Sequence, residues 1–268
     1  MLQYINNEEK AGYKEILGKE QHLNFLRLSI LQLTPDFKEY AAESLDEEIA
    51  IVPINGEVTV WANSKELGTI GRRGDVFSET AEIAYISTNT KYNIHLNESQ
   101  KSSKVLLCRT KAERHFPPFI INKTDYGTEK RGKGQWNRTV RNILVDNVEG
   151  KVDRLVLGET INDPGQWSGY PPHRHVNDNY PEELPFEEVY FYDFDPKGGF
   201  GIQVLYGSKY VEDRGFIIKS GDAFAIPDGF HPVVGAGGYK VYYLWFMAGP
   251  KGRKLKPFLD PKYKWVES

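Results

Sequence analysis

The chain has 268 residues, of which 40% are hydrophobic and 13% aromatic, and its formal net charge is −3. This length suggests one or two domains with a sizeable core, and the balanced charge argues against a nucleic-acid or anionic-membrane partner. No apolar run approaches the length of a membrane span, and the N-terminus lacks the basic and apolar regions of a signal peptide. The single cysteine, Cys108, cannot form an internal disulfide, so we expect a buried thiol in a reducing cytoplasm.

Short strands account for most of the chain. The pattern predicts strands at 49–53, 56–61, 83–86, 91–95 and 103–108, and then at 154–157, 188–192, 200–205, 216–218, 223–226 and 239–246. Gly, Pro, Asn and Asp separate them at intervals of roughly 8–12 residues, which is typical of an all-β sandwich or barrel. Only short helical turns are expected, at 21–27 and 260–263.

A weak internal repeat suggests two similar β modules in tandem. The segment 46–51 (DEEIAI) resembles 186–191 (FEEVYF), and 74–77 (GDVF) resembles 221–224 (GDAF). The polar, glycine-containing segment 122–134 is the expected boundary, so the first domain should span 1–125 and the second 126–268. The first copy lacks the histidine motifs of the second, and we expect it to be degenerate.

The second module contains a candidate metal site. His173 and His175 alternate within 168–175, so a strand would place both imidazoles on one face. Glu188 and His231 follow further along the chain. Three histidines and one glutamate form a mixed nitrogen and oxygen ligand set that suits one divalent ion per chain, with positions open for water or substrate. Zinc is the expected metal, with manganese, iron and nickel as alternatives.

These segments resemble the two signature motifs of the cupin family. Four residues match the second motif: Gly221, Pro227, Gly229 and His231. One residue separates Gly229 from His231, where the family pattern has two. The first motif matches the histidine pair, but twelve residues separate His175 from Glu188. The resemblance implies an all-β protein of two tandem cupin barrels of the jelly-roll type, with metal only in the second.

A closer resemblance covers roughly residues 130–250. The segments 167–175, 187–191, 227–232 and 239–250 look like those of the 5-deoxy-glucuronate isomerases of bacterial myo-inositol catabolism. This resemblance implies an aldose-ketose isomerase that converts 5-deoxy-glucuronate to 5-dehydro-2-deoxy-gluconate. The 5-keto-4-deoxyuronate isomerases of pectin breakdown share the metal set and provide an alternative substrate. The cupin motifs also suit a metal-dependent oxygenase or a non-catalytic sugar-binding protein.

Strand alternation relates the neighbours of the glutamate to one another. If Glu188 points into the barrel, Tyr190 and Tyr192 also point inward, while Glu187 faces solvent and Glu187→Ala should be nearly silent. Glu187 remains the alternative metal ligand. The base that carries the proton is left open among a metal-bound hydroxide, Tyr190, Tyr192 and Glu188.

The carboxylate of a sugar acid requires a partner, and a planar guanidinium binds it bidentately. Arg138 and Arg141 lie upstream of the metal motif and are three residues apart, so a regular strand places them on opposite faces. At most one of them should therefore bind the substrate. Gln203 is a further candidate, and its alternative is an outward polar side chain. The expected partner is a small-molecule sugar acid, and self-association is left open.

Overall fold

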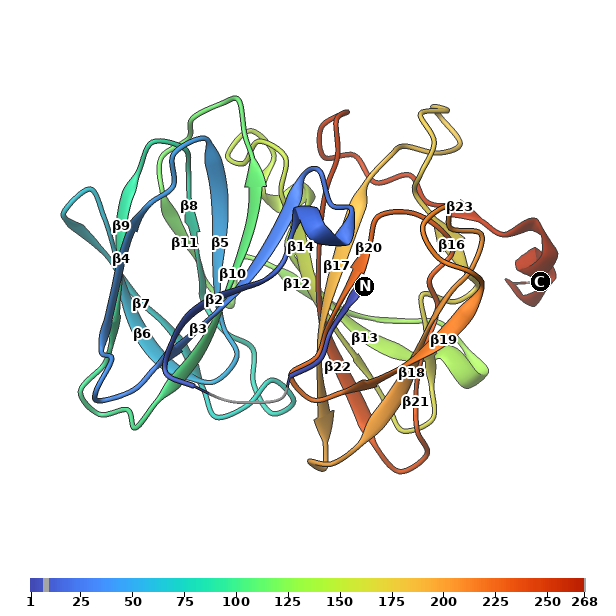
Figure 1. Cartoon of the computed structure of the whole chain (residues 1–268), viewed down its shortest axis with the longest axis horizontal. Helices are drawn as coiled ribbons and strands as arrows, with labels where there is room; N and C mark the ends of the chain where they lie inside the picture. The colour runs from blue at the N-terminus through green and yellow to red at the C-terminus, as the bar shows by residue number, and fades with distance from the viewer. Residues whose placement is uncertain (7–9, 268) are drawn as a thin grey trace.

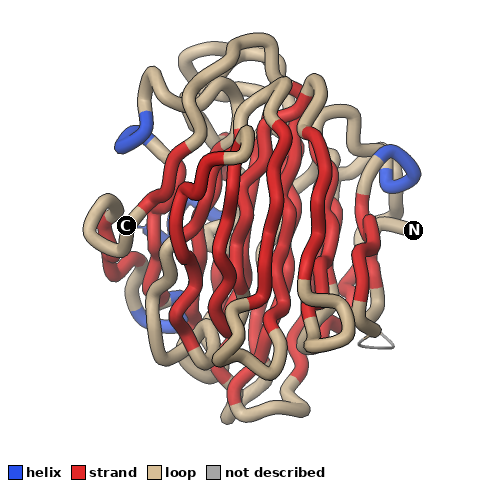
Figure 2. The backbone as a smooth tube through the Cα atoms, turned by 90° about the vertical axis from the view of Figure 1, so that its left-hand side faces the viewer, coloured by secondary structure: helices blue, strands red, loops and turns tan. Residues whose placement is uncertain are grey.

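A computed structural model of the chain describes residues 1–6 and 10–267. In these ranges the chain forms two β-barrels that lie side by side, the N-terminal barrel on the left of Figure 1 and the C-terminal barrel on the right. Figure 2 shows that long strands dominate and that helix is confined to short turns. The predicted all-β fold of two barrels is confirmed.

The first barrel consists of two antiparallel sheets. The six-stranded sheet has the order β11-β8-β5-β10-β3-β2, and the four-stranded sheet has the order β4-β9-β6-β7. The bounds of its strands are β2 (Gly12–Leu17), β3 (Leu26–Leu33), β4 (Glu39–Glu43), β5 (Glu47–Pro53), β6 (Gly56–Ala62), β7 (Lys65–Arg73), β8 (Ile83–Ile86), β9 (Lys91–Leu96), β10 (Ser103–Lys111) and β11 (Phe119–Ile121).

The second barrel repeats this arrangement. Its seven-stranded sheet has the order β1-β20-β17-β22-β14-β13-β12, its four-stranded sheet has the order β15-β21-β18-β19, and β16 pairs with β23. The bounds of its strands are β1 (Gln3–Tyr4), β12 (Gly127–Arg131), β13 (Arg138–Leu144), β14 (Val156–Asn162), β15 (Trp167–Ser168), β16 (His173–Arg174), β17 (Glu187–Asp195), β18 (Phe200–Leu205), β19 (Arg214–Lys219), β20 (Ala223–Ile226), β21 (Val233–Gly235), β22 (Lys240–Ala248) and β23 (Phe258–Leu259).

The first strand of the chain lies outside the domain in which a boundary at 125 places it. β1 pairs with β20, so residues 3–4 extend the sheet of the second barrel. This pairing covers the edge of β20 and accompanies the burial of Leu2, which is 2% exposed. The chain otherwise passes from one barrel to the other between β11 and β12.

The helical turn expected at 21–27 is wrong. A 3₁₀ turn, η1 (Lys19–Gln21), shares only Gln21 with this segment, and β3 begins at Leu26. Leu26 and Leu28 are buried two residues apart, a period that suits a strand. The turn expected at 260–263 overlaps η4 (Pro261–Glu267), and two further 3₁₀ turns are η2 (Gly134–Trp136) and η3 (Asp146–Val148).

Two clusters of buried hydrophobic side chains form the core. The smaller cluster fills the first barrel with aliphatic side chains such as Ile51 and Val58. The larger cluster includes Val52 of β5 and Val189 of β17, so it spans the facing surfaces of the two large sheets and continues into the second barrel. Within the described ranges, no helix has the length and apolar character needed to cross a membrane.

Candidate metal centre

Three histidines meet inside the second barrel. His173 lies in β16, His175 follows that strand, and His231 lies between β20 and β21. One ring nitrogen of each lies within 4.8 Å of those of the other two, and no second group of this kind occurs in 1–6 and 10–267. Glu188 of β17 completes the set, because its Oε2 lies 2.9 Å from His175 Nε2 and 3.1 Å from His231 Nε2.

Backbone carbonyls orient two of these imidazoles. His175 Nδ1 lies 2.8 Å from the carbonyl oxygen of Phe186, and His231 Nδ1 lies 2.9 Å from that of Gly229. An Nδ1–H that donates to a carbonyl leaves the Nε2 lone pair facing the centre, as in protein metal sites.

The surroundings of His231 fit a metal ion. Its Nε2 is buried and has no hydrogen-bond partner among the described residues, although Glu188 Oε2 is close. An unpartnered buried nitrogen costs free energy that a coordinated ion would remove. The turn before it requires glycine, because Gly229 has a φ of 87° and an added Cβ would lie 2.9 Å from the Tyr206 carbonyl oxygen.

The protonation states also suit metal binding. Burial, and then repulsion from His231 and His175, lowers the pKa of His173 from 6.5 to about 3. Burial alone would raise the pKa of Glu188, but hydrogen bonds with His175 and His231 outweigh it and hold the pKa below its ordinary value of 4.5. At neutral pH the site thus offers the neutral imidazole of His173 and the carboxylate of Glu188, the forms that coordinate metals. Burial would lower the pKa of His175, but its hydrogen bond with Glu188 outweighs burial and raises that pKa above 6.5.

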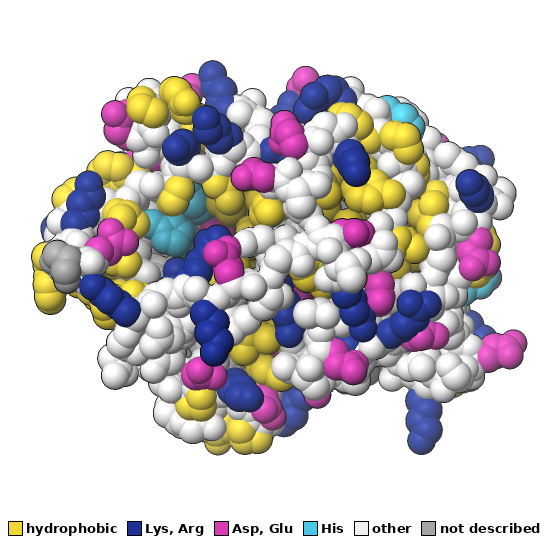
Figure 3. Space-filling model, turned by 180° about the vertical axis from the view of Figure 1, so that it is seen from behind, with side chains coloured by type: hydrophobic (Ala, Val, Ile, Leu, Met, Phe, Trp, Pro, Cys, Tyr) yellow, Lys and Arg dark blue, Asp and Glu magenta, His cyan; other side chains and the backbone are white. Residues whose placement is uncertain are grey.

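A cavity of about 280 Å³ gives access to this centre. His173, His175 and Glu188 line one part of it, while His231 is fully buried behind them. Figure 3 shows histidine side chains at the bottom of a hollow on the left, with hydrophobic and basic side chains at its rim. Tyr190 also lines the cavity, and burial raises the pKa of its hydroxyl well above the usual 10.

The two arginine candidates separate as strand alternation requires. Arg138 lines the cavity together with Val140, two residues further along β13. Arg141 lies on the opposite face, where it donates hydrogen bonds to Glu159 Oε2 at 2.9 Å and to the carbonyl oxygen of Val76 at 3.2 Å. Of these two arginines only Arg138 lines the cavity, and Arg141 forms a buried contact between the barrels.

Tyr192 and Gln203 do not line the cavity. The hydroxyl of Tyr192 donates to Gln203 Oε1 at 2.7 Å, and Gln203 Nε2 donates to the carbonyl oxygen of His231 at 3.0 Å. Both side chains are buried behind the centre. They support the His231 loop, and the expectation that they contact substrate or its protons is corrected.

Glu187 does not face solvent. It is 6% exposed, and its carboxylate accepts hydrogen bonds from the backbone N–H groups of Asn24, Phe25 and Leu26. The prediction that Glu187 faces solvent is therefore wrong, and Glu187→Ala is now expected to leave buried N–H groups unpaired. Alternation turned Glu187 away from the barrel interior as predicted, but that side of β17 is covered by the first barrel.

Sequence reasoning missed two tyrosines of the cavity, Tyr170 and Tyr243. Tyr243 lines it, and its hydroxyl lies 2.5 Å from Ser168 Oγ. The signal was available in β22, because Tyr243, Trp245 and Met247 alternate along the strand and all three line the cavity. Lys256, which also lines the cavity, lies in a loop without any periodic pattern.

Comparisons with known proteins relate nearly the whole chain to one family. The chain matches the model of the KduI/IolB family over residues 3–266. It is 34% identical over 264 residues to a 5-deoxy-glucuronate isomerase of Bacillus licheniformis, an alignment that covers 97% of this chain and 95% of that protein.

Two solved structures are similar to the whole chain. An IolB-like protein from Salmonella typhimurium LT2 superposes with a TM-score of 0.91 at 26% identity and covers 100% of both chains. A cupin 2 conserved barrel domain protein from Leptotrichia buccalis has a TM-score of 0.52 at 17% identity and covers 92% of both chains, a likeness of fold alone. The two barrels are thus cupin barrels.

Proposed function

The chain belongs to the KduI/IolB family, and on this premise we propose that it is a metal-dependent aldose-ketose isomerase. The proposed reaction converts 5-deoxy-glucuronate to 5-dehydro-2-deoxy-gluconate, as the similarity to 5-deoxy-glucuronate isomerases suggests. The observation that carries the proposal is the convergence of three histidines and Glu188 beside Arg138 in one cavity. We also propose a cytoplasmic location, because Cys108 is a buried free thiol.

We expect His173, His175, Glu188 and His231 to hold one divalent ion per chain. Zinc is the preferred ion for this set, and manganese, iron and nickel are the alternatives. A bound ion would act as a Lewis acid toward adjacent carbonyl and hydroxyl oxygens of a sugar. The carbonyl oxygens that receive the Nδ1–H groups of His175 and His231 keep these rings from turning away.

Arg138 is the proposed partner of the substrate carboxylate. Its Nη1 donates to the Trp136 carbonyl oxygen at 3.1 Å, and a guanidinium has further N–H donors that can bind a carboxylate bidentately. Arg131 and Lys256 line the same cavity and add positive charge to it. A uronate fits this division, with a cationic region for its acid group and a ligand cluster for its reacting end.

Tyr190 is the proposed donor to a substrate oxygen. It lies two residues after Glu188 on the same face of β17, and its side chain lines the cavity. The isomerisation transfers one proton between neighbouring carbons and one from the hydroxyl oxygen to the carbonyl oxygen, with no net oxidation. The phenolic O–H of Tyr190 can hold or deliver the oxygen-bound proton at its hydroxyl.

A direct assay tests the function. Purified protein would be incubated with 5-deoxy-glucuronate before and after treatment with a chelator, and then again after Zn²⁺ is restored. We expect isomer formation that is lost on chelation, returns with the metal, and needs no nicotinamide or flavin. Turnover of 5-keto-4-deoxyuronate in its place, or oxygen consumption without isomer formation, would contradict the proposal.

A further inference from the structure

Glu187 ties the strand of the candidate metal centre to the first barrel. Its Oε1 accepts from Asn24 N at 2.7 Å and Asn24 Nδ2 at 3.0 Å. Its Oε2 accepts from Phe25 N at 2.8 Å and Leu26 N at 3.3 Å. These residues lead directly into β3, so one buried carboxylate accepts the backbone hydrogen bonds at the start of a strand of the first barrel. We call this set of contacts the Glu187 clasp.

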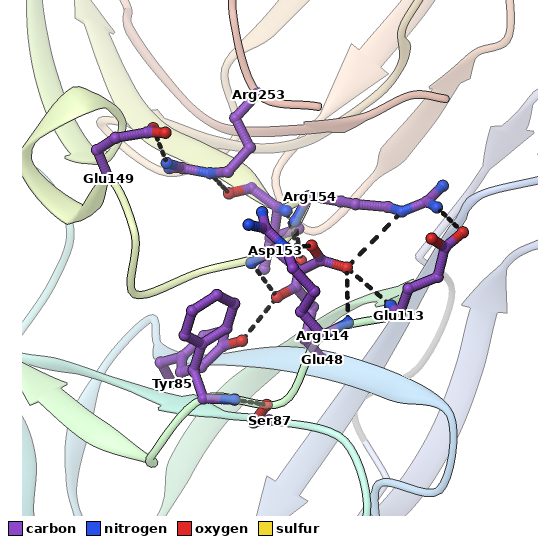
Figure 4. Close-up of polar contacts among 11 residues, drawn as sticks. Glu48, Tyr85, Ser87, Glu113, Arg114, Glu149, Asp153, Arg154 and Arg253 are labelled. Carbon is purple, nitrogen blue, oxygen red and sulfur yellow. Dashed lines mark hydrogen bonds and ion pairs between the residues drawn. The ribbon is translucent and has the colours of Figure 1, made fainter. Parts of the chain in front are cut away.

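The first barrel makes the reciprocal contact, in which one of its carboxylates accepts hydrogen bonds from backbone N–H groups of the second barrel. Glu48 of β5 accepts hydrogen bonds from Asp153 N at 2.9 Å, Arg154 N at 2.7 Å and Leu155 N at 2.6 Å. These residues lead into β14, and the hydroxyl of Tyr85 adds a bond to Glu48 at 2.7 Å. Figure 4 shows Glu48 with its partners Tyr85, Asp153 and Arg154, a set of contacts that we call the Glu48 clasp.

The two clasps occupy equivalent places. β5 lies between β8 and β10, as β17 lies between β20 and β22. Glu48 shares the interface face of β5 with Ala50 and Val52, and Glu187 shares that of β17 with Val189 and Phe191. The repeat in the sequence aligns Glu48 with Glu188, but by strand face Glu48 corresponds to Glu187.

The residues beside the two clasps differ. Beside Glu187 stands Glu188, whose carboxylate meets His175 and His231. Beside Glu48 stands Glu47, whose Oε1 accepts from Arg27 Nε at 2.7 Å. By strand face, Glu47 corresponds to Glu188, but its carboxylate pairs with the guanidinium of Arg27. Only the Glu187 clasp therefore adjoins a candidate metal centre.

We infer that Glu187 is a positioning residue for the metal centre, a role that rests on the proposed function. Adjacent residues of a strand point to opposite faces, so the backbone that Glu187 holds against β3 is also the origin of the Glu188 side chain. Partners that orient a ligand typically affect metal affinity even though they do not touch the ion. The first barrel thereby contributes three backbone N–H groups to the geometry of a centre in the second.

Glu187→Gln and Glu48→Gln form a matched pair of variants for the test. Each replaces a buried carboxylate acceptor by an amide whose N–H₂ group faces N–H donors, and both clasps join the same two barrels. We would measure Zn²⁺ affinity by competition with a chromophoric chelator, and denaturant midpoints of the metal-depleted proteins. We expect both variants to lower the midpoint, and Glu187→Gln alone to weaken Zn²⁺ binding, by roughly 10–100-fold.

Equal Zn²⁺ affinities in the two variants would overturn the inference, because a general loosening of the interface would then explain every effect. If Glu187→Gln fails to fold, Glu187→Asp takes its place. This variant keeps the negative charge but shortens the side chain by one methylene, and it should also weaken Zn²⁺ binding. Wild-type affinity in Glu187→Asp would also overturn the inference. A wild-type protein that does not bind Zn²⁺ at all would refute the metal centre, and with it the proposed function. Tight wild-type binding with an unaffected Glu187 variant would refute the positioning role alone.

Discussion

The side chains around the candidate metal centre are of two kinds: some line the cavity, and others support the residues that line it. Tyr190 and Arg138 line the cavity. Gln203 does not line it and instead donates a hydrogen bond to the carbonyl oxygen of His231. Truncating a cavity residue should change binding or turnover with little effect on the fold. Truncating a supporting residue should change stability first, because a buried partner is left unpaired.

His231→Ala should weaken metal binding without unfolding the barrel. The change removes a fully buried donor whose Nε2 faces Glu188, and an ion with fewer ligands is held less tightly. The loss should exceed the roughly 10–100-fold that is typical of an outer partner. Metal content after dialysis would be compared with that of His95→Ala, because His95 lies in the first barrel, where its ring centroid is 4.5 Å from that of Trp61. Wild-type retention in His231→Ala would contradict the assignment.

Arg138→Leu should raise KM for the uronate strongly, while kcat changes less. The loss of a desolvated charge pair would lower kcat/KM by the equivalent of about 2–5 kcal/mol. Arg138→Lys keeps the charge but loses the bidentate geometry, so it should fall between Leu and wild type. Arg141→Leu is the matched comparison on the other face of β13 and should lower the unfolding midpoint instead. Steady-state kinetics that show an unchanged KM in Arg138→Leu would place the carboxylate elsewhere.

At the scale of elements, the large sheets are joined by polar groups as well as by apolar packing. Glu159 of β14 lies 2.8 Å from Arg73 Nη1 of β7 and 2.9 Å from Arg141 Nη1, and it also accepts from the hydroxyl of Tyr242 at 2.8 Å. Glu159 is 1% exposed and Arg73 is 2% exposed. Removing one member of such a buried ion-pair network strongly destabilises the folded protein, because the remaining buried charges are left uncompensated.

Glu159→Gln should destabilise the protein at neutral pH by about 3–5 kcal/mol. Burial would raise the pKa of Glu159, but Arg73 and Arg141 outweigh it and hold the pKa below its ordinary 4.5. A lowered pKa in the folded state means that this stability is present above pH 4.5 and is lost as the pH falls through the folded-state value. Urea unfolding between pH 7 and pH 3 should therefore show a flatter acid dependence in Glu159→Gln.

Glu129→Gln provides the control for this series, since Glu129 pairs with Arg131 at the surface. Exposed pairs contribute about 0–1 kcal/mol, so its unfolding free energy should stay close to that of the wild type. An equal effect of both replacements would show that Glu159 does not hold the sheets together.

For the whole molecule, the continuous core predicts that the barrels unfold together. The larger cluster joins Leu28 and Val52 of the first barrel to Val189 and Phe246 of the second. A lone second barrel would expose this surface and lose β3, which receives the Glu187 clasp. We therefore expect the second barrel to need the first for its stability, although the described part of the first barrel holds no cluster of metal-ligating residues.

Zn²⁺ should stabilise both barrels, although the candidate metal centre lies in only one of them. An ion present at 100 times its Kd adds about 2.7 kcal/mol to the free energy of unfolding. A variant that retains Trp61 as its only tryptophan would report on the first barrel by fluorescence, while circular dichroism follows the whole chain. Coincident transitions that shift together with Zn²⁺ are expected. A Trp61 transition that ignores Zn²⁺ would show that the barrels unfold independently.

The sequence by itself determined the all-β fold, the two modules and the histidine motifs. These features depend on local periodicity and on short spacings, as with the strands predicted at 83–86, 200–205 and 223–226, which coincide with β8, β18 and β20. Alternation likewise separated Arg138 from Arg141 and Glu187 from Glu188, because adjacent strand positions face opposite ways.

Tertiary structure alone decided what covers each face. Nothing near Glu187 in the sequence indicates that Asn24 and its neighbours lie against it, since the contact spans 163 residues. The same holds for Arg141, whose partner Glu159 and whose carbonyl acceptor at Val76 come from different barrels. Alternation relates the faces of one strand to each other, but only the docking of two sheets decides which face meets solvent, substrate or the other barrel.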